Sequence, residues 1–411
     1  MNNNDISEQP SNKFPEYKKR LLIPVVGVTV LLSACCGFFA AKHLLASTAE
    51  NNENAVEIKS DVLNFTEAQN QIFKFSADGK TVIGLRDTRV AEINIPEGIA
   101  AIGDKAFAGC RNLTAVTIPD SVISIGNKAF WCCSNLQKVR ISNRVKELGN
   151  SAFAYCIKLS EIHLPEGVAT VGDRALCGVR SVKVAEANPV FKSDKHGVLF
   201  DIKRHKLLFF PRKFQGNYTI PAEVTAIAND AFGNVENVEF SSQSPFFKVD
   251  EFGALIDTRN NKILYLPRQF KGNYTIPDGV AAIGEVAFEY CKNLTGITIP
   301  DSVTVIGKYA FAECKNLKTI DFGQKVSVVG DCAFRSCENV REVVLPDSVT
   351  SIGFSAFEYC ESLIRVSVPD GVKRIEAYAF NGCPRLKSVS SPKNCTVEDR
   401  VFSERCEVVR R

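Results

Sequence analysis

A 23-residue repeat dominates the chain. The segment LTAVTIPDSVISIGNKAFWCCSN (113–135) matches LTGITIPDSVTVIGKYAFAECKN (294–316), and both follow L-x-x-V-x-I-P-x-x-V-x-x-I-G-x-x-A-F-x-x-C with Ile and Val interchangeable. Self-similarity at a fixed period is typical of solenoids, in which each copy is a coil that buries its apolar side only against its neighbours. The repeat therefore restricts most of the chain to a stack of equivalent coils.

Two positions of the repeat recur most strictly. The aromatic slot holds Phe107, Phe130, Phe153, Leu176, Phe288, Phe311, Phe334, Phe357 and Phe380, with a degenerate copy at Phe402. A cysteine follows three residues later at Cys110, Cys133, Cys156, Cys291, Cys314, Cys337, Cys360 and Cys383. Residues that recur at one position of every coil are expected to fill the core.

The pattern within one copy predicts the path of a coil. Val116 and Ile118 alternate with a polar residue, as in a β-strand, and Pro119 ends that strand because it cannot donate a hydrogen bond to a ladder. A second apolar pair, Val122 and Ile125, crosses back over the core, and the segment around Phe130 fits a short helical turn. Stacking predicts an α/β-type repeat solenoid, with one parallel β-sheet face and short helical turns opposite.

Two inserted units interrupt the repeat at 188–277. Residues 197–221 (GVLFDIKRHKLLFFPRKFQGNYTIP) parallel residues 253–277 (GALIDTRNNKILYLPRQFKGNYTIP), 56 residues later. Each unit has two apolar runs around a polar turn, a pattern that predicts a β-hairpin. The expected organisation is a cap hairpin at 61–89, coils at 90–187, the two inserted units at 188–277, and coils with a C-terminal cap at 278–406.

The N-terminal segment predicts export. Residues 1–20 are polar and end in Lys-Lys-Arg, and residues 21–41 carry no charge over a length that, as a helix, spans about 30 Å. The basic flank places 1–20 in the cytoplasm, 21–41 as a single transmembrane signal anchor and 42–60 as a polar linker outside. A cleaved signal peptide is one alternative, and a lipoprotein with Cys35 as the lipidated residue is another.

The repeat resembles the BspA-like bacterial leucine-rich repeat family, whose 23-residue unit is matched by LxxVxIPxxVxxIGxxAFxxC between Val90 and Cys406. Family members also contain inserted GVLF…YTIP units. The resemblance implies a leucine-rich repeat fold and a cell-surface or secreted protein that binds other proteins or cells. The departures are Leu176 and Phe232, whose coils lack the cysteine three residues later.

The 15 cysteines are expected to be packed thiols rather than a chemical site. Equivalent positions in adjacent coils lie about 4.8 Å apart and point the same way, whereas a disulfide needs Cβ atoms about 3.8 Å apart that face each other. Cys395 and Cys406 lie outside the register, and a disulfide between them is the alternative. No spacing typical of a zinc site occurs, so neither a metal nor a cofactor is predicted.

The sequence gives no support for catalysis. Four histidines are present, and none lies in a motif of a hydrolase, a metalloprotease or a phosphate-binding loop. The recurring aspartates, such as Asp120 and Asp301, follow the turn of the repeat. A net charge of +4 gives no general affinity for polyanions, and nucleic acid is not an expected partner of an exported domain.

Charge varies on two predicted surfaces. The outward strand positions change from coil to coil and include Arg140, His163 and Lys183. The first inserted unit is basic, whereas the second carries Asp250, Glu251 and Asp257 in the matching stretch. The candidate partner-contact residues are Arg140, His163, Lys183, Lys203, Arg204, His205, Lys206, Arg212 and Lys213. A solvated face without a partner is the competing interpretation.

The sequence thus predicts a membrane-anchored, exported solenoid that binds a protein or an acidic cell-surface polymer. A structural spacer or envelope scaffold that acts by self-association is the alternative, and the oligomeric state is left open.

Overall fold

The computed structural model describes residues 23–25, 28–30, 71–233, 235–403 and 406–410, in two units, Met1–Gln69 and Asn70–Arg411. In the first unit, β1 (Ile23–Val25) and β2 (Val28–Val30) pair antiparallel, so these six residues of the predicted anchor are extended strands and not part of the expected helix. The rest of the predicted anchor at 21–41, Cys35, and the segments 1–20 and 42–60 lie outside the described residues. Within the described part of the chain, no helix has the length and apolarity needed to cross a bilayer.

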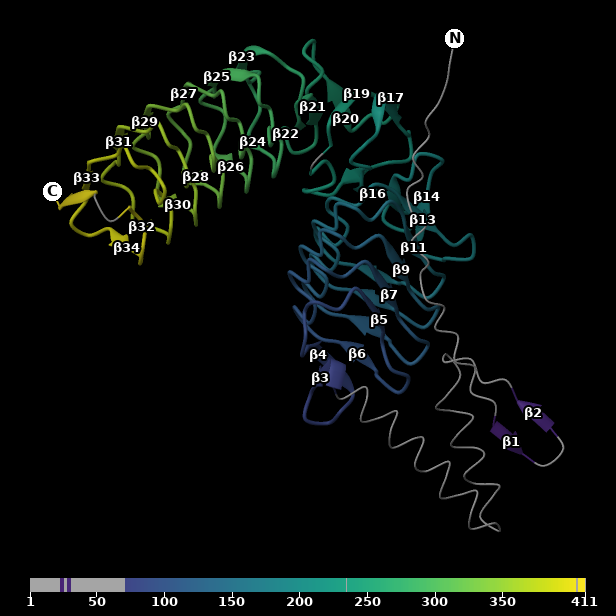
Figure 1. Ribbon diagram of the computed structural model, residues 1–411. Helices are drawn as coiled ribbons and strands as arrows, with labels where there is room; N and C mark the ends of the chain where they lie inside the picture. Colours follow the sequence, from purple (N-terminus) through teal and green to yellow (C-terminus); the bar gives the residue numbers. More distant parts are fainter. Residues whose placement is uncertain (1–22, 26–27, 31–70, 234, 404–405, 411) are drawn as a thin grey trace, which may run out of the picture. The chain divides into compact units, whose positions relative to one another are not determined.

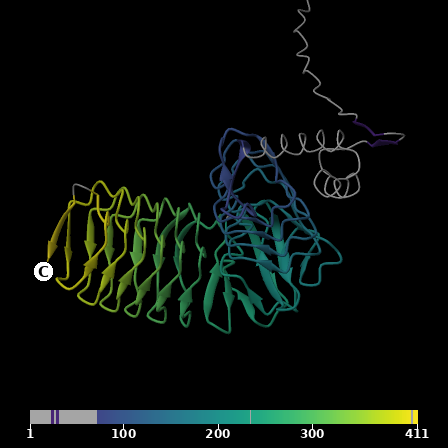
Figure 2. The same ribbon diagram turned by 90° about the horizontal axis from the view of Figure 1, so that it is seen from below.

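The second unit is a stack of coils, and each regular coil contributes two strands (Figures 1 and 2). The first strand comes from the V-x-I segment: β7 (Ala115–Thr117) pairs in parallel with β5 (Glu92–Asn94) and β9 (Lys138–Arg140). The corresponding strands of the later coils continue this first ladder in separate parallel groups: β11 (Ile162–Leu164) with β13 (Val182–Val184), β17 (Gln215–Ile220) with β19 (Asn237–Ser242), β23 (Gly272–Thr275) with β25 (Leu294–Thr298) and β27 (Thr319–Asp321), and β29 (Glu342–Val344) with β31 (Arg365–Ser367), β33 (Ser388–Ser391) and β35 (Glu407–Arg410).

The prediction of one parallel sheet face was incomplete, because a second parallel ladder runs along the coils. It is built from two-residue strands: β6 (Ala101–Ile102), β8 (Ser124–Ile125), β10 (Glu147–Leu148), β12 (Thr170–Val171), β18 (Ala226–Ile227), β24 (Ala282–Ile283), β26 (Val305–Ile306), β28 (Val328–Val329), β30 (Ser351–Ile352), β32 (Arg374–Ile375) and β34 (Thr396–Val397). The residues before the repeat glycine are extended, and this stretch bonds to the preceding coil: Ile123 N–H donates to the Ala100 carbonyl and Gly126 N–H donates to the Ile102 carbonyl, each at 2.8 Å.

Antiparallel hairpins begin each section of the second ladder. They consist of β3 (Phe73–Phe75) with β4 (Thr81–Leu85), then β14 (Phe191–Ser193), β15 (Leu199–Asp201) and β16 (Lys206–Phe209), and then β20 (Phe247–Val249), β21 (Leu255–Asp257) and β22 (Lys262–Tyr265). The last strand of each hairpin pairs in parallel with the next coil: β4 with β6, β16 with β18, and β22 with β24. The second ladder is therefore interrupted between β12 and β14 and between β18 and β20.

The predicted helical turns opposite the sheet are wrong, because this arc consists of successive tight turns. The residues two before and two after the aromatic slot have positive φ, for example Lys128 (55°) and Cys132 (58°), and left-handed residues cannot continue a right-handed helix. Between them the backbone bonds to the next coil, as in Phe130 N–H to the Ala152 carbonyl at 2.7 Å. These inter-coil bonds hold ordinary residues in a conformation that glycine usually takes.

The core confirms the predicted role of the repeated residues. Phe107, Phe130 and Phe153 are fully buried, with ring centres 5.0 Å apart at both steps. Phe311 lies 4.6 Å from Phe288, and the stack continues to Phe402. The buried apolar residues form three clusters. They correspond to the coils before the insertions, to the inserted units, and to the β20–β22 hairpin with the coils after it.

Candidate functional site

The cysteine ladder forms part of the packing of the coils. The Cys133 thiol donates a hydrogen bond to the Phe107 carbonyl of the preceding coil at 3.0 Å, and Cys314 does the same to Phe288. Burial raises the pKa of Cys133 to about 12, so the thiol stays protonated. All cysteines that the structure describes are free, including Cys395 and Cys406. Over the same residues, no group of three His, Cys, Asp or Glu side chains is placed to hold a metal ion.

The outward strand positions form a row on the first ladder. Arg140 lies on β9, and His163 on β11 is the direct ladder neighbour of Lys183 on β13. All three side chains are exposed, because the residues on either side of each strand position turn inward or pack against the core. Three predicted contact residues therefore share one surface.

One turn of the first insertion extends this row. The turn at 194–197 packs against β13: Val184 N–H donates to Ser193 Oγ at 3.0 Å, and a Cβ on Gly197 would lie 2.5 Å from Ser181 Oγ. His196 in this turn lies edge-on to the Phe214 ring at 5.1 Å, which brings the neighbouring Lys213 to the same corner. We define the basic strip as six exposed residues: Arg140, His163, Lys183, Lys195, His196 and Lys213.

The rest of the predicted basic cluster lies elsewhere. Lys203, Arg204, His205 and Lys206 form the β15–β16 turn, at the opposite end of the hairpin strands from the turn at 194–197. Arg204 is paired with the buried Asp201 at 2.7 Å, and the same carboxylate accepts the N–H groups of residues 203 and 204. The hairpin thus divides the cluster into two groups.

Arg212 belongs to neither group. It is half-buried, and its Nε lies 3.7 Å from a carboxylate oxygen of Glu236. This ion pair offsets its charge. Arg212 is accordingly a weaker contact candidate than the exposed residues of the basic strip.

The second insertion has the same aromatic corner with less positive charge, since Glu251 and Gln269 stand where the first has Lys195 and Lys213, and one lysine, Lys271, follows Phe270. Phe252 stands where the first insertion has His196, with its ring 5.9 Å from Phe270 and 5.8 Å from Tyr274. Tyr274 donates to Asp250 at 2.6 Å, just as Tyr218 donates to Asp194 at 2.8 Å. Because the two corners have the same construction, the hairpin fold does not require the charge of the first one.

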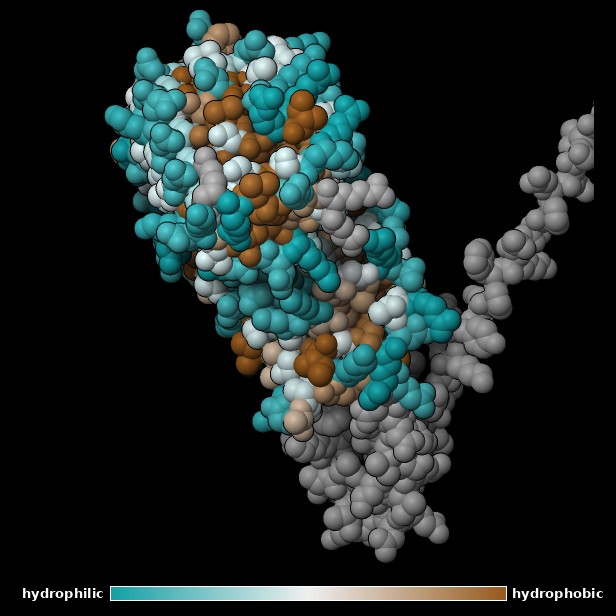
Figure 3. All heavy atoms as spheres, turned by 90° about the vertical axis from the view of Figure 1, so that its left-hand side faces the viewer, coloured by the Kyte–Doolittle hydropathy of each residue, from teal (hydrophilic) through white to brown (hydrophobic). Residues whose placement is uncertain are grey.

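Aromatic side chains are exposed on the turn arc, a feature that our sequence analysis missed. Phe354 and Tyr359 are 46% and 43% exposed, and Phe354 lies 5.5 Å from the Tyr378 ring. Seen from the side of the C-terminal coils, apolar surface is surrounded by polar side chains (Figure 3). A signal was present in the repeat, since five of the nine tyrosines stand two residues from an aromatic slot: Tyr155, Tyr290, Tyr309, Tyr359 and Tyr378.

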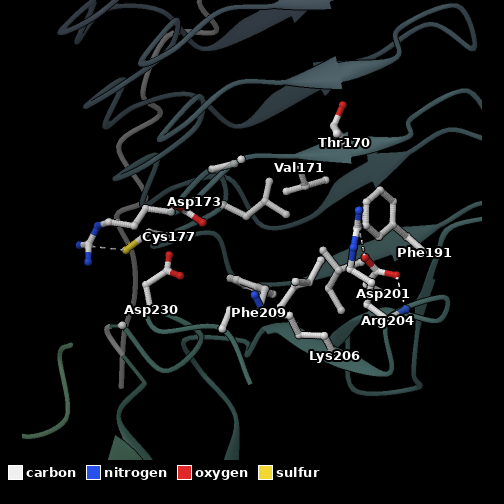
Figure 4. A pocket seen from close by; sticks show the side chains of 18 of the residues that line it. Thr170, Val171, Asp173, Cys177, Phe191, Asp201, Arg204, Lys206, Phe209 and Asp230 are labelled. Carbon is white, nitrogen blue, oxygen red and sulfur yellow. Dashed lines mark hydrogen bonds and ion pairs between the residues drawn. The ribbon is translucent and has the colours of Figure 1, made fainter. Parts of the chain in front are cut away.

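A cavity of about 200 Å³ lies at the interruption of the second ladder between β12 and the β14–β16 hairpin (Figure 4). Its walls combine apolar residues, such as Phe191 and Phe209, with the charged residues Asp173, Asp230 and Lys206. Burial raises the pKa of Asp230, an effect that the Arg174 guanidinium partly offsets. The sequence did not indicate this cavity, because its walls come from segments that the insertion separates.

Comparison with known proteins agrees with the repeat architecture. The model of the BspA type leucine rich repeat region matches residues 85–192 and 273–409 in six copies. The chain belongs to this family. Similar solved structures include a leucine rich cell surface protein of Faecalibacterium prausnitzii, with 26% identity, 82% of this chain and 92% of that chain covered, and a TM-score of 0.45.

Other similar structures are more distant in sequence. They include a leucine-rich repeat protein of Eubacterium ventriosum, with 24% identity, 79% and 87% of the two chains covered, and a TM-score of 0.41. The pneumococcal vaccine antigen PcpA has 15% identity, 84% and 98% coverage, and a TM-score of 0.45. No curated protein matches the chain.

Proposed function

We propose that this BspA-type repeat protein is an exported binding protein without catalysis, and that it contacts an acidic protein or cell-surface polymer through the basic strip. The supporting observation is that six cationic or ionisable side chains from coils and insertion share one exposed surface. No described ion pair involves these six side chains. Their positive field is therefore available to attract an acidic partner and to speed its association.

Binding to heparin and to polyglutamate tests this function with defined acidic probes. The full chain is expected to bind at low ionic strength and to lose affinity as salt rises, because exposed charges are screened beyond about 10 Å at 0.1 M salt. Combined reversal of Arg140, Lys183 and Lys213 to Glu should weaken binding by about ten- to a hundredfold, given about 0.5–1 kcal/mol for each exposed charge pair.

Reversal of Lys203 and His205 to Glu is the control for the paired reversal of Lys183 and His163 to Glu, which changes the net charge by the same amount, since Lys203 and His205 are also exposed but lie on the other turn. It should leave the affinity almost unchanged. Equal losses in both variants would point to a general charge effect and would refute the basic strip as the contact surface. Concentration-dependent assembly of the chain without any probe would favour the self-associating scaffold instead.

We also propose that residues 21–41 anchor the chain in the membrane with the repeats outside. The proposal rests on the uncharged length of this segment and its basic flank. Protease added to intact cells should then digest the repeats. A change of Cys35 to Ala separates the alternatives: fatty-acid labelling that the variant loses would identify a lipoprotein, and an unlabelled, full-length membrane protein would identify an anchor.

A further inference from the structure

The basic strip follows the axis of the coil stack, across the strands rather than along them. Arg140, His163 and Lys183 take the same outward position on β9, β11 and β13, which belong to three successive coils (Figure 1). His163 and Lys183 are direct partners in the ladder, where neighbouring strands lie about 4.8 Å apart. The strip therefore presents one basic or ionisable side chain per coil.

The turn at 194–197 adds two more side chains of the strip, Lys195 and His196, beyond β13. The one acidic residue of this turn, Asp194, is engaged by the fold. Its Oδ1 accepts the N–H groups of residues 196 and 198 at 2.9 Å, and its Oδ2 accepts the Tyr218 hydroxyl at 2.8 Å. Because both oxygens already have donors, the side chains that this turn offers to a partner are the basic ones.

Exposed carboxylates lie beside the strip. They occupy the turns that follow β7, β11 and β13, and we call them the acidic margin: Asp120, Glu166 and Glu186. On the other side of His163, Glu161 is exposed as well, because Ile162 between them faces the core. At β11 the strip is consequently only one side chain wide.

A broad acidic partner does not fit this pattern. A folded protein typically covers about 800 Å² of its partner in a stable interface, an area that would include the strip and the acidic margin together. Its carboxylates would then meet those of Glu161, Glu166 and Glu186, and like charges across an interface oppose binding. A linear chain that lies along the strip meets only the basic side chains.

The spacing of the coils favours a polysaccharide among linear polyanions. A sugar unit of an extended polysaccharide advances its chain by a distance close to the coil spacing, so anionic groups on successive sugars can lie beside successive coils. An extended peptide instead places the side chains of one face about 6.6 Å apart, at every second residue. Its carboxylates therefore lose register with the coils along the strip.

We propose that a linear anionic polysaccharide binds along the basic strip, with its chain parallel to the stack axis and its sulfate or carboxylate groups beside successive coils. This inference rests on the proposed function and narrows the partner to one class of polymer. The Arg140 guanidinium can donate two parallel hydrogen bonds to one anionic group, whereas the ammonium groups of the lysines act as point charges.

Calorimetric titration of the full chain at one fixed ionic strength tests the inference. The probes are the disaccharide, tetrasaccharide and octasaccharide fragments of heparin, a polyglutamate peptide with the net charge of the octasaccharide, and serum albumin as an acidic folded protein. Affinity should rise by at least about tenfold from the disaccharide to the octasaccharide, because the longer chain contacts several coils at once. Polyglutamate should bind at least about threefold more weakly than the octasaccharide, and serum albumin should not bind measurably.

Single variants at the two ends of the strip locate the polysaccharide. Arg140→Gln and Lys213→Gln each remove one charge and should each weaken octasaccharide binding by about two- to fivefold. Disaccharide binding should change little, because this short fragment can still bind at the other end. Lys203→Gln is the matched control: it removes one charge from the β15–β16 turn and should leave all three affinities unchanged.

The outcomes separate this inference from the proposed function. If no probe binds, both are refuted. If all heparin fragments bind with equal affinity, or if polyglutamate or serum albumin binds as tightly as the octasaccharide, an acidic partner is retained and the polysaccharide along the strip is refuted. An effect of Lys203→Gln equal to that of Arg140→Gln would likewise refute this placement of the chain.

Discussion

The Arg174 guanidinium lies 5.2 Å from the centre of the Tyr309 ring. Arg174 belongs to the last coil before the insertions and Tyr309 to a coil after them, although regular coils touch only their neighbours. The same guanidinium donates to the Tyr155 hydroxyl at 3.0 Å. The contact therefore links two sections of the solenoid that are separated in sequence by both inserted units.

This contact should contribute measurably to stability. Arg174→Met and Tyr309→Leu are each expected to destabilise the chain, and a double-mutant cycle should give a coupling of about 1 kcal/mol, as for a partly desolvated cation–π pair. Urea denaturation of the four proteins provides the free energies of unfolding. Strictly additive losses would show that the two side chains do not interact in solution.

The Phe stack should dominate the stability of the later coils. Phe311→Ala removes a fully buried ring from between Phe288 and Phe334 and is expected to cost about 3–5 kcal/mol. Val344→Ala is the control, because Val344 is 56% exposed on the first ladder and should change stability by about 0.5 kcal/mol or less. An unchanged melting curve for Phe311→Ala would contradict the coil packing.

The thiol ladder should make stability fall in alkaline solution. Burial raises the pKa of Cys133 to about 12 and raises that of Cys337 as well, whereas an unfolded thiol ionises near pH 8.5. Below that pH both states are protonated and the stabilisation is complete. Above it only the unfolded state loses protons, so each such thiol should reduce the free energy of unfolding by up to about 1.4 kcal/mol per pH unit.

Urea denaturation between pH 7 and pH 10 measures this slope. Cys133→Ala should flatten it by the contribution of one thiol, in addition to a constant loss from the cavity that it leaves. A wild-type stability that stays level across this range would show that the thiols are not buried as described.

A ladder of polar side chains at the edge of the arc should also contribute to stability, because Asp104, Asn127 and Asn150 each accept a backbone N–H of the next coil. Asn150→Ala removes the acceptor for the Asp173 N–H and is expected to cost about 1 kcal/mol. Asn150→Asp keeps an acceptor oxygen at this position and should cost less than half of that. Thermal denaturation distinguishes them, and equal effects of the two substitutions would show that the side-chain acceptor is unimportant.

The sequence predicted the strands and the core because a period of 23 residues forces equivalent residues to stack. It did not predict the conformation of the arc. Positive φ is rare for residues such as Lys128 and Tyr155, and hydrogen bonds to adjacent coils hold them in this conformation. Local propensity favoured helical turns, and contacts between coils overrode it.

The candidate surfaces were harder to predict for a different reason. Lys203 and Lys213 are close in sequence, but the β15–β16 hairpin and the chain after it place them in separate groups. Conversely, Asp173 and Asp230 are far apart in sequence and line one cavity. Such proximity depends on where the ladder stops and restarts, which the spacing of apolar residues does not specify.

Each rung of the two ladders takes its backbone partners only from adjacent rungs. In-frame gain or loss of 23 codons would therefore leave the remaining hydrogen bonds of the array with equivalent partners, whereas a deletion of one or two codons would shift a phenylalanine out of its column. Genes for such chains can consequently change the number of exposed positions over generations while the interior stays the same.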